Sequence, residues 1–235
     1  MPLAVRYRKL KKRGVLMNVL VACEESQRVC SAFREKGHNA FSCDIVPCSG
    51  GHPEWHILGD VLPLLNGNCD FVTMDGVKHK IDEKWDLLIA HPPCTYLSNA
   101  GARWLYAGGE LNWKRYRKGL EGKKFFMAML NADCPRIAVE NPIPSSIYDL
   151  PQYTQIIQPY QFGEPWSKKT CLWLKGLEPL YPTNIVSDYK PYCSSGSYSG
   201  THNPKYKGAS RKGGSAKSRS KTFHGIAEAM AEQWE

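Results

Sequence analysis

The sequence contains no run of about 18 or more apolar residues, and residues 1–16 lack the apolar stretch of a secretory signal peptide. These absences predict an intracellular protein that does not cross a membrane. The sequence also has no glycine-rich dinucleotide-binding turn and no phosphate-binding P-loop, which argues against NAD, FAD and ATP as cofactors. No segment is repeated along the 235 residues, a length that fits one domain with a substantial core.

The nine cysteines are odd in number and scattered along the chain. This pattern is typical of reduced thiols in a cytoplasm rather than of a disulfide scaffold. Four residues in one Pro- and Gly-rich segment, Cys43, Cys48, His52 and His56, have the donor types of a tetrahedral zinc site. No second cysteine knuckle accompanies them, so an ordered loop packed around Trp55 is the favoured interpretation and no metal site is predicted.

The formal net charge of +9 is concentrated in two segments. Residues 6–13 hold six basic residues and no acidic one, and residues 205–221 hold seven basic residues and no acidic one. Without these 13, the chain has 18 Lys and Arg against 22 Asp and Glu, so its body is mildly acidic. Two basic segments on an acidic body favour contact with nucleic-acid phosphates over a role as solubilising tails.

Short apolar runs alternate with segments of helical periodicity from Asn18 onward. Strands are expected at residues 19–22, 39–43, 85–90 and 137–139, helices at 26–36 and 111–131, and a later antiparallel strand at 170–174. This alternation predicts an α/β fold with a mainly parallel sheet and helices on both faces.

Composition divides the chain into four segments. They are a basic extension at residues 1–16, an α/β body at 17–175, a small basic loop-rich insert at 176–221, and a terminal helix at 222–235 that packs on the body. The insert is rich in Gly, Ser, Pro, Tyr and Lys and has little periodicity. We expect it to provide at most a minimal recognition surface for nucleic acid.

Two short motifs carry most of the chemical information. His91-Pro92-Pro93-Cys94 follows the strand expected at 85–90, and Glu140-Asn141-Pro142 follows the one expected at 137–139. Because the carboxyl ends of parallel strands meet at one edge, a thiol and a carboxyl group are predicted side by side where open α/β sheets bind ligands. A thiolate is a nucleophile, and a carboxyl group can hold or protonate a ring nitrogen. A small buried Cys94 and a loop-capping Glu140 are the structural alternatives.

This pair of motifs resembles the DNA cytosine carbon-5 methyltransferases, in the compact form found in bacteriophages and prophages. The resemblance implies a Rossmann-like, S-adenosylmethionine-dependent fold over residues 17–175, in the cytoplasm of a bacterial host, with protection from restriction as the usual purpose. It further implies that Cys94 attacks carbon 6 of a cytosine flipped out of duplex DNA while Glu140 holds N3. Amino-methyltransferases carry an aromatic residue after Pro-Pro, so Cys94 favours transfer to carbon.

The resemblance places the cofactor at the carboxyl ends of the first strands. The residues that it assigns to S-adenosylmethionine are Ala22, Cys23, Glu24, Asp44, Ile45, Asp60 and Pro92. Asp44 would accept hydrogen bonds from the ribose and Asp60 would meet the adenine amino group, although both also suit turns. Cys23 and Glu24 depart from the wider family, which usually has glycines in this turn.

The residues that the resemblance assigns to DNA are Ser98, Asn99, Asn141, Lys168, Thr170, Arg211, Lys212 and Arg219. Ser98 and Asn99 follow the expected nucleophile in a predicted loop that could close over the flipped base. Lys168 and Thr170 stand where the family's Gly-x-Pro-Gln-x-Arg-x-Arg motif has its two arginines, so bidentate contacts are lost. Since phosphate contacts carry no sequence information directly, a short or relaxed target preference is expected.

Two other functions stay open. The small insert is compatible with the same chemistry on RNA or on a free pyrimidine nucleotide. The altered first turn is compatible with a non-catalytic DNA-binding protein on a methyltransferase scaffold that no longer holds the cofactor. Methylation of cytosine carbon 5 in DNA is the primary prediction.

Overall fold

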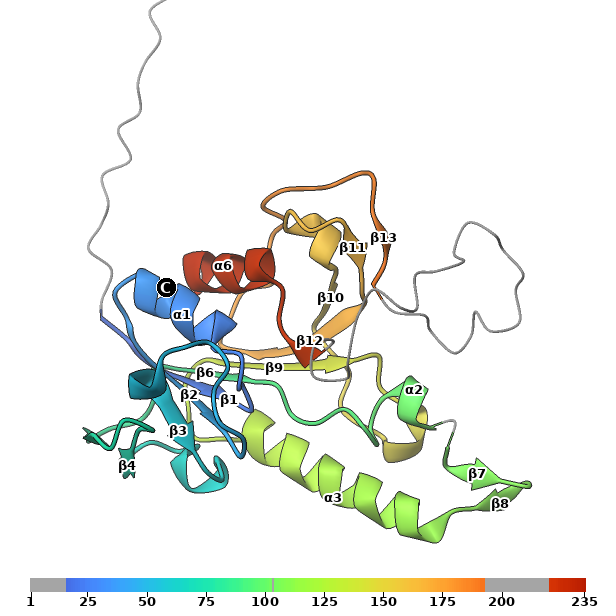
Figure 1. Cartoon of the computed structure of the whole chain (residues 1–235). Helices are drawn as coiled ribbons and strands as arrows, with labels where there is room; N and C mark the ends of the chain where they lie inside the picture. The colour runs from blue at the N-terminus through green and yellow to red at the C-terminus, as the bar shows by residue number, and fades with distance from the viewer. Residues whose placement is uncertain (1–15, 103, 193–219) are drawn as a thin grey trace, which may run out of the picture.

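A seven-stranded sheet forms the centre of the computed structural model, which describes residues 16–102, 104–192 and 220–235 (Figure 1). Its strands, in spatial order, are β10 (Gln155–Ile157), β12 (Thr170–Lys175), β9 (Ile137–Pro142), β6 (Leu87–Ala90), β1 (Asn18–Ala22), β2 (Asn39–Asp44) and β3 (His56–Leu58). The predicted mainly parallel α/β sheet is confirmed. Strands β3, β2, β1, β6 and β9 pair in parallel, and β12 runs antiparallel between β9 and β10.

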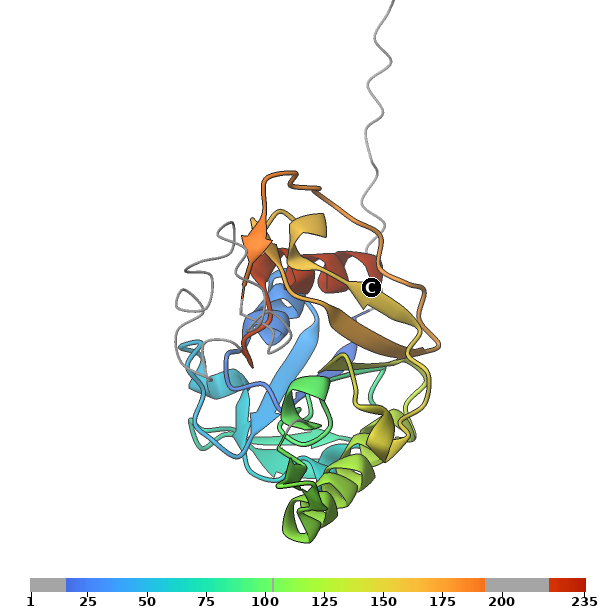
Figure 2. The same cartoon turned by 90° about the vertical axis from the view of Figure 1, so that its right-hand side faces the viewer.

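Helices cover both faces of the sheet. On one face α1 (Arg28–Glu35) packs against α6 (His224–Gln233), and on the other lies α3 (Trp113–Leu130), as Figures 1 and 2 show. The hairpin of β4 (Cys69–Val72) and β5 (Lys78–Ile81) joins the core on the α3 side. None of the helices in the described ranges has the length and apolar composition needed to span a bilayer.

Several short elements connect this framework. They are η1 (Pro53–Trp55), η2 (Leu62–Leu64), α2 (Asn99–Ala102), β7 (Tyr106–Ala107), β8 (Glu110–Leu111), η3 (Ser146–Tyr148), η4 (Pro159–Gln161), β11 (Trp166–Ser167) and β13 (Lys190–Pro191). The small pair β7–β8 is antiparallel, and β11–β13 is parallel.

Side-chain alternation along the strands produces one apolar core on each face of the sheet. In β1, Val19 and Val21 pack with Met230 of α6, whereas Leu20 packs with Phe126 of α3. All five side chains are at most 1% exposed. A strand buried on both faces is apolar at every position, so β1 and β6 read in the sequence as continuous apolar runs.

The strand order reverses beside β1. From β1 the chain continues outward to β2 and β3, and then returns to β6 on the other side of β1. The carboxyl ends of β1 and β6 therefore flank a topological switch point, where open α/β sheets bind their ligands. The register pairs Ala22 with Ala90 and Ala90 with Val139, so the three segments that follow these residues start at the same edge.

Candidate active site

Cys94 and Glu140 lie on neighbouring segments of this carboxyl edge. Strand β6 ends at Ala90, and the chain continues to the partly buried Cys94 as irregular backbone. Glu140 lies within β9, which pairs with β12 as far as Pro142. The strand end expected at Val139 is therefore wrong, because the antiparallel β12 supplies backbone partners that the apolar pattern does not reveal.

His91 is the direct partner of Glu140, a contact that the sequence analysis missed. Its Nδ1 lies 3.1 Å from Glu140 Oε2, and the two side chains are 9% and 17% exposed. Burial works against a charge on His91, but the hydrogen bond and the charge of Glu140, together with Glu24, leave its pKa raised. Burial also opposes ionisation of Glu140, yet His91 and the charge of Lys168 lower its pKa. Both shifts favour the ion pair of His91 and Glu140.

The thiol of Cys94 belongs to the same electrostatic group. Burial is the main cause that raises its pKa, the charge of Glu140 adds to it, and Lys168 offsets part of it. The thiol is therefore protonated at neutral pH in the free protein, and the thiolate needs stabilisation by a substrate. The charges of Glu140 and Lys168 therefore both act on Cys94, although the three residues belong to three separate motifs of the sequence.

Asn141 links the two main motifs to each other. Its Nδ2 donates a hydrogen bond to the carbonyl oxygen of Pro92 at 3.2 Å. In the described part of the chain, its buried Oδ1 and the buried Nε2 of His91 have no hydrogen-bond partner. Since buried polar atoms are almost always paired, two unpaired ones at one edge indicate a place where a ligand or water completes the hydrogen bonding.

The other residues assigned to DNA have different surroundings. Ser98 is buried, and its Oγ accepts a hydrogen bond from the backbone N–H of Gly101 at 3.2 Å. Thr170 is also buried, at the start of β12, whereas Asn99 is exposed at the start of α2. The remaining three, Arg211, Lys212 and Arg219, lie outside the described residues.

Arg115 of α3 holds the segment after Cys94 in place, although nothing in the sequence analysis pointed to it. One guanidinium nitrogen donates to the carbonyl oxygens of Thr95 and Gly101, each at 3.1 Å. The guanidinium carbon also lies 4.8 Å from the ring centre of Tyr96. The segment that was expected to be a mobile loop is therefore anchored to α3 at three points.

The first strand-to-helix turn has a glycine-like backbone without glycine. Cys23 and Gln27 have φ angles of 59° and 58°, in the left-handed region that favours glycine. Gln27 is compensated, because its side chain donates to the carbonyl oxygen of His52 at 2.8 Å and accepts from its N–H at 3.1 Å. The turn therefore has two positions whose backbone favours glycine but that hold other residues.

This geometry predicts opposite outcomes for two substitutions at Cys23. Cys23→Gly should change the free energy of unfolding by less than about 1 kcal/mol, because relief of the left-handed strain offsets the flexibility of glycine. Cys23→Val should lower it by about 2 kcal/mol, since a β-branched side chain tolerates this conformation poorly. Urea unfolding of both variants measures the difference. Equal stabilities would show that Cys23 does not need its positive φ.

Glu24 has a structural task in the same turn. Its two carboxylate oxygens accept hydrogen bonds from the backbone N–H groups of Val29 at 2.7 Å and Cys30 at 3.1 Å. The carboxylate thereby satisfies donors in the first turn of α1, which lack partners within the helix. Ala22 is fully buried, and its carbonyl oxygen accepts the N–H of His91 at 2.9 Å. Both residues are engaged by the chain itself.

Asp44 and Asp60 form an acidic rim beside Cys23. Burial first, and then the charges of these two residues, raise the pKa of the Cys23 thiol. In each aspartate, Oδ1 accepts the backbone N–H two residues further on, at 3.1 and 3.0 Å. Ile45, next to Asp44, is 79% exposed. An acidic rim with an exposed apolar side chain suits a cationic ligand that has hydroxyl groups and a flat apolar ring.

The four residues considered as zinc ligands do not surround a common point. The ring nitrogens of His56 lie 2.9 Å from Ser42 Oγ and 3.0 Å from the carbonyl oxygen of Val46, so both already have partners. Nδ1 of His52 lies 3.0 Å from Glu54 Oε1. Among residues 16–102, 104–192 and 220–235, no group of three or more His, Cys, Asp or Glu residues could hold a metal ion.

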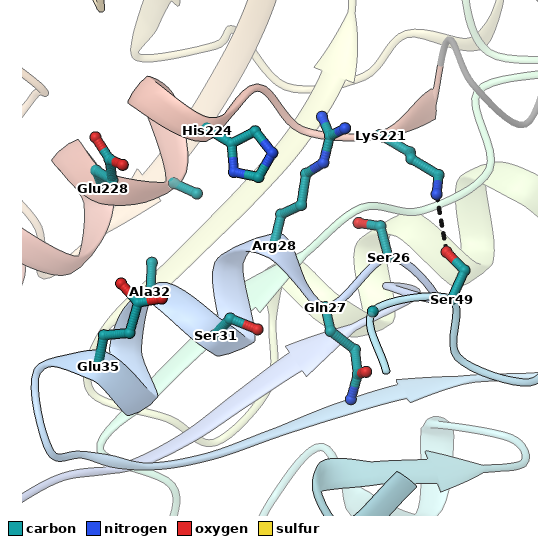
Figure 3. A pocket seen from close by; sticks show the side chains of 12 residues that line it. Ser26, Gln27, Arg28, Ser31, Ala32, Glu35, Ser49, Lys221, His224 and Glu228 are labelled. Carbon is teal, nitrogen blue, oxygen red and sulfur yellow. Dashed lines mark hydrogen bonds between the residues drawn. The ribbon is translucent and has the colours of Figure 1, made fainter. Parts of the chain in front are cut away.

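A hollow of about 310 Å³ lies between α1 and α6 (Figure 3). Its lining is polar and of mixed charge, with Arg28 and Lys221 together with Glu35 and Glu228. Neither Cys94 nor Glu140 lines this hollow, and none of the residues predicted to bind the cofactor does. Small-molecule sites are mostly apolar, so this hollow is a poorer candidate than the carboxyl edge of the sheet.

Comparisons with known proteins add little to this description. No family model matches the chain, and no curated protein does. Among solved structures, the chain is similar to that of a methyltransferase from Entamoeba histolytica, EhMeth, with 13% identity and a TM-score of 0.37. The match covers 77% of this chain and 61% of that protein. A likeness this distant carries no argument about the reaction. The reaction has to be inferred from the residues of the site.

Proposed function

We propose that the protein is an S-adenosylmethionine-dependent methyltransferase that modifies carbon 5 of cytosine in DNA. The observation that supports this most is the position of Cys94 and Glu140 on the neighbouring segments of β6 and β9 at the switch-point edge, where the charge of Lys168 acts on both. A nucleophile and an ionised carboxylate on adjacent strand ends suit addition to a ring carbon next to a ring nitrogen. The motifs resemble those of the cytosine carbon-5 enzymes in residue type and order.

The acidic rim is the part of the site that fits the cofactor. Asp44 and Asp60 can accept hydrogen bonds from hydroxyl and amino groups, and their negative charge suits the sulfonium. Ile45 offers an exposed apolar surface to the adenine, and the left-handed turn at Cys23 allows close approach to the backbone. When bound, S-adenosylmethionine supplies the methyl group.

The protein's own residues account for the proton balance of the addition step. Attack of the Cys94 sulfur on carbon 6 breaks the S–H bond, and N3 of the ring gains the negative charge. Glu140 is the nearby ionised group, so it can accept the thiol proton and deliver it to N3. One proton leaves sulfur, one reaches N3, and the product is a neutral enamine with a nucleophilic carbon 5.

His91 and Lys168 prepare Glu140 for this exchange. His91 orients the carboxylate through its 3.1 Å contact and keeps it ionised. Lys168 lowers the pKa of both Cys94 and Glu140, so its positive charge assists formation of the thiolate. The unpaired Oδ1 of Asn141 is an acceptor for the exocyclic amine of the cytosine.

The DNA part of the proposal rests on the burial of the site and on charge. Cys94 is only partly exposed, so a base must leave the helical stack to reach it, as enzymes that modify bases require. The basic segments at residues 6–13 and 205–221 supply phosphate-binding charge. RNA and free nucleotides remain alternative substrates with the same chemistry.

Transfer of tritiated methyl from S-adenosylmethionine tests the proposal. The purified full-length chain is incubated with unmethylated duplex DNA, single-stranded DNA, RNA or cytidine nucleotides, and the labelled product is hydrolysed to nucleosides. We expect label in 5-methylcytosine from duplex DNA. Label only in RNA or nucleotides would reassign the substrate, label in N4-methylcytosine would contradict the role of Cys94, and no label would favour a non-catalytic DNA-binding protein.

A further inference from the structure

Beyond the carboxyl edge, one short stretch of chain, residues 104–118, exposes three large aromatic side chains and several cations. Its residues, which we call the aromatic–basic surface, are Trp104, Tyr106, Trp113, Lys114, Arg117 and Lys118. The three aromatic side chains are 60%, 56% and 64% exposed, and the three basic residues are exposed as well. Between residues 104 and 120 the only acidic residue is Glu110. A surface this rich in exposed rings is unusual unless it binds something.

The surface is built on ordered backbone. Strands β7 and β8 form a hairpin whose turn residues, Gly108 and Gly109, have φ angles of 60° and 87°, as two-residue turns with positive φ require. Asn112 then caps α3 by accepting the N–H of Arg115 at 3.0 Å. Trp113 lies on the first turn of α3, with its ring edge-on to Tyr116 at 5.9 Å. The aromatic rings are therefore presented on a defined scaffold.

This scaffold is connected directly to the segment that carries Cys94. Figure 1 places α2, the β7–β8 hairpin and the start of α3 together, beyond the ends of β6 and β9. Arg115 bridges them through its hydrogen bonds to Thr95 and Gly101. A polymer bound on the aromatic–basic surface would therefore lie beside the candidate active site.

The chemistry of the surface fits a nucleic-acid strand better than a protein. Base rings stack on aromatic side chains, and Lys and Arg bind the phosphates between them. Protein–protein interfaces are depleted in Lys, which provides two of the three cations here. We propose that the aromatic–basic surface binds the DNA strand next to the flipped cytosine, its rings stacking on bases and its cations contacting phosphates. The assignment of the flipped cytosine rests on the proposed function; the binding of DNA does not.

Fluorescence anisotropy with a labelled cytosine-containing duplex tests the surface independently of catalysis. The aromatic double variant Trp104→Ala/Trp113→Ala should weaken binding by about tenfold or more, given what base stacking contributes. The triple variant Lys114→Gln/Arg117→Gln/Lys118→Gln should reduce the slope of log K against log salt by about 2 to 3. Matched controls are Tyr181→Ala, whose side chain is 68% exposed, and Lys78→Gln/Lys80→Gln on the β4–β5 hairpin. Circular dichroism checks that each variant is folded.

The outcomes separate this inference from the proposed function. Two results would contradict DNA binding by this surface: unchanged affinity and salt slope in both surface variants, or no DNA binding by the wild type at low salt. A protein would then be the partner that the surface binds. Loss of binding in the variants but not in the controls supports it, even if the wild type transfers no methyl group. If the variants still transfer methyl groups and bind DNA normally, the aromatic–basic surface does not bind DNA, whereas the proposed enzymatic function is supported.

Discussion

Replacing Cys94 with alanine is expected to eliminate methyl transfer, with a loss of at least about 10⁴-fold in kcat. In the proposed reaction the thiol forms the bond to carbon 6, and without that bond carbon 5 of cytosine is a poor nucleophile. The loss should fall on kcat rather than on KM, because alanine removes the nucleophile and leaves the surrounding pocket unchanged. Initial rates of tritium transfer to duplex DNA measure the effect.

A mechanism-based substrate gives a second reading of the same substitution. DNA with 5-fluorocytosine at the target should trap a covalent complex with the wild type, because fluorine cannot leave as a proton does from carbon 5. The complex should survive denaturing electrophoresis and be absent with Cys94→Ala.

Cys69→Ala is the matched control, since Cys69 is another partly exposed free thiol, on the distant strand β4. It should form the trapped complex normally. A trapped complex with Cys94→Ala, or its loss in Cys69→Ala, would contradict the assigned nucleophile.

Much of the sheet could be predicted because its strands are buried on both faces. The runs that became β1 and β6 are apolar at nearly every position, and α1 buries apolar residues at helical spacing. In β2 polar residues interrupt the run, and in α3 most of the apolar residues lie near the carboxyl end. A strand that is buried on both faces consists mostly of apolar residues, so it can be recognised in the sequence. The order of motifs then placed Cys94 and Glu140 at one edge, because parallel strands end on the same side.

The parts that escaped prediction depend on contacts between distant segments. Strand β10 is three residues long and exists through its pairing with β12, which no local pattern records. The pairing of His91 with Glu140 joins residues 49 positions apart. Arg115 was missed because a basic residue near a helix start usually faces solvent. Only the adjacency of His91 to Pro92 could have hinted at a role, since any side chain there lies at the switch point.

Replacing Glu140 with glutamine is expected to lower kcat/KM by about 10³-fold. Glutamine has nearly the same shape and can still accept a hydrogen bond from His91, but it cannot take a proton from sulfur and give it to N3. Tritium transfer measured against DNA concentration gives the ratio. Glu83→Gln is the control, because Glu83 is exposed at the opposite edge of the sheet, before β6. A loss smaller than about tenfold would mean that another group moves this proton.

The same substitution should also change how stability depends on pH. In the wild type the folded-state pKa of His91 is raised above its ordinary value of 6.5, so the stability it contributes is fully present below that value and is lost as the pH rises through the folded pKa. Glu140 has a lowered pKa, so its contribution is present above 4.5 and is lost as the pH falls through its folded pKa.

Stability from this pair should therefore be greatest between about pH 4.5 and 6.5. Glu140→Gln leaves His91 buried beside a neutral amide, where burial favours the uncharged ring and its pKa falls. Urea unfolding at a series of pH values should then show wild-type stability decreasing above pH 6.5 and that of the variant decreasing less or increasing. Parallel profiles would show that His91 and Glu140 do not form an ion pair in the folded protein. The ionised state of Glu140, which suits it to exchange a proton with Cys94, would then lack its support.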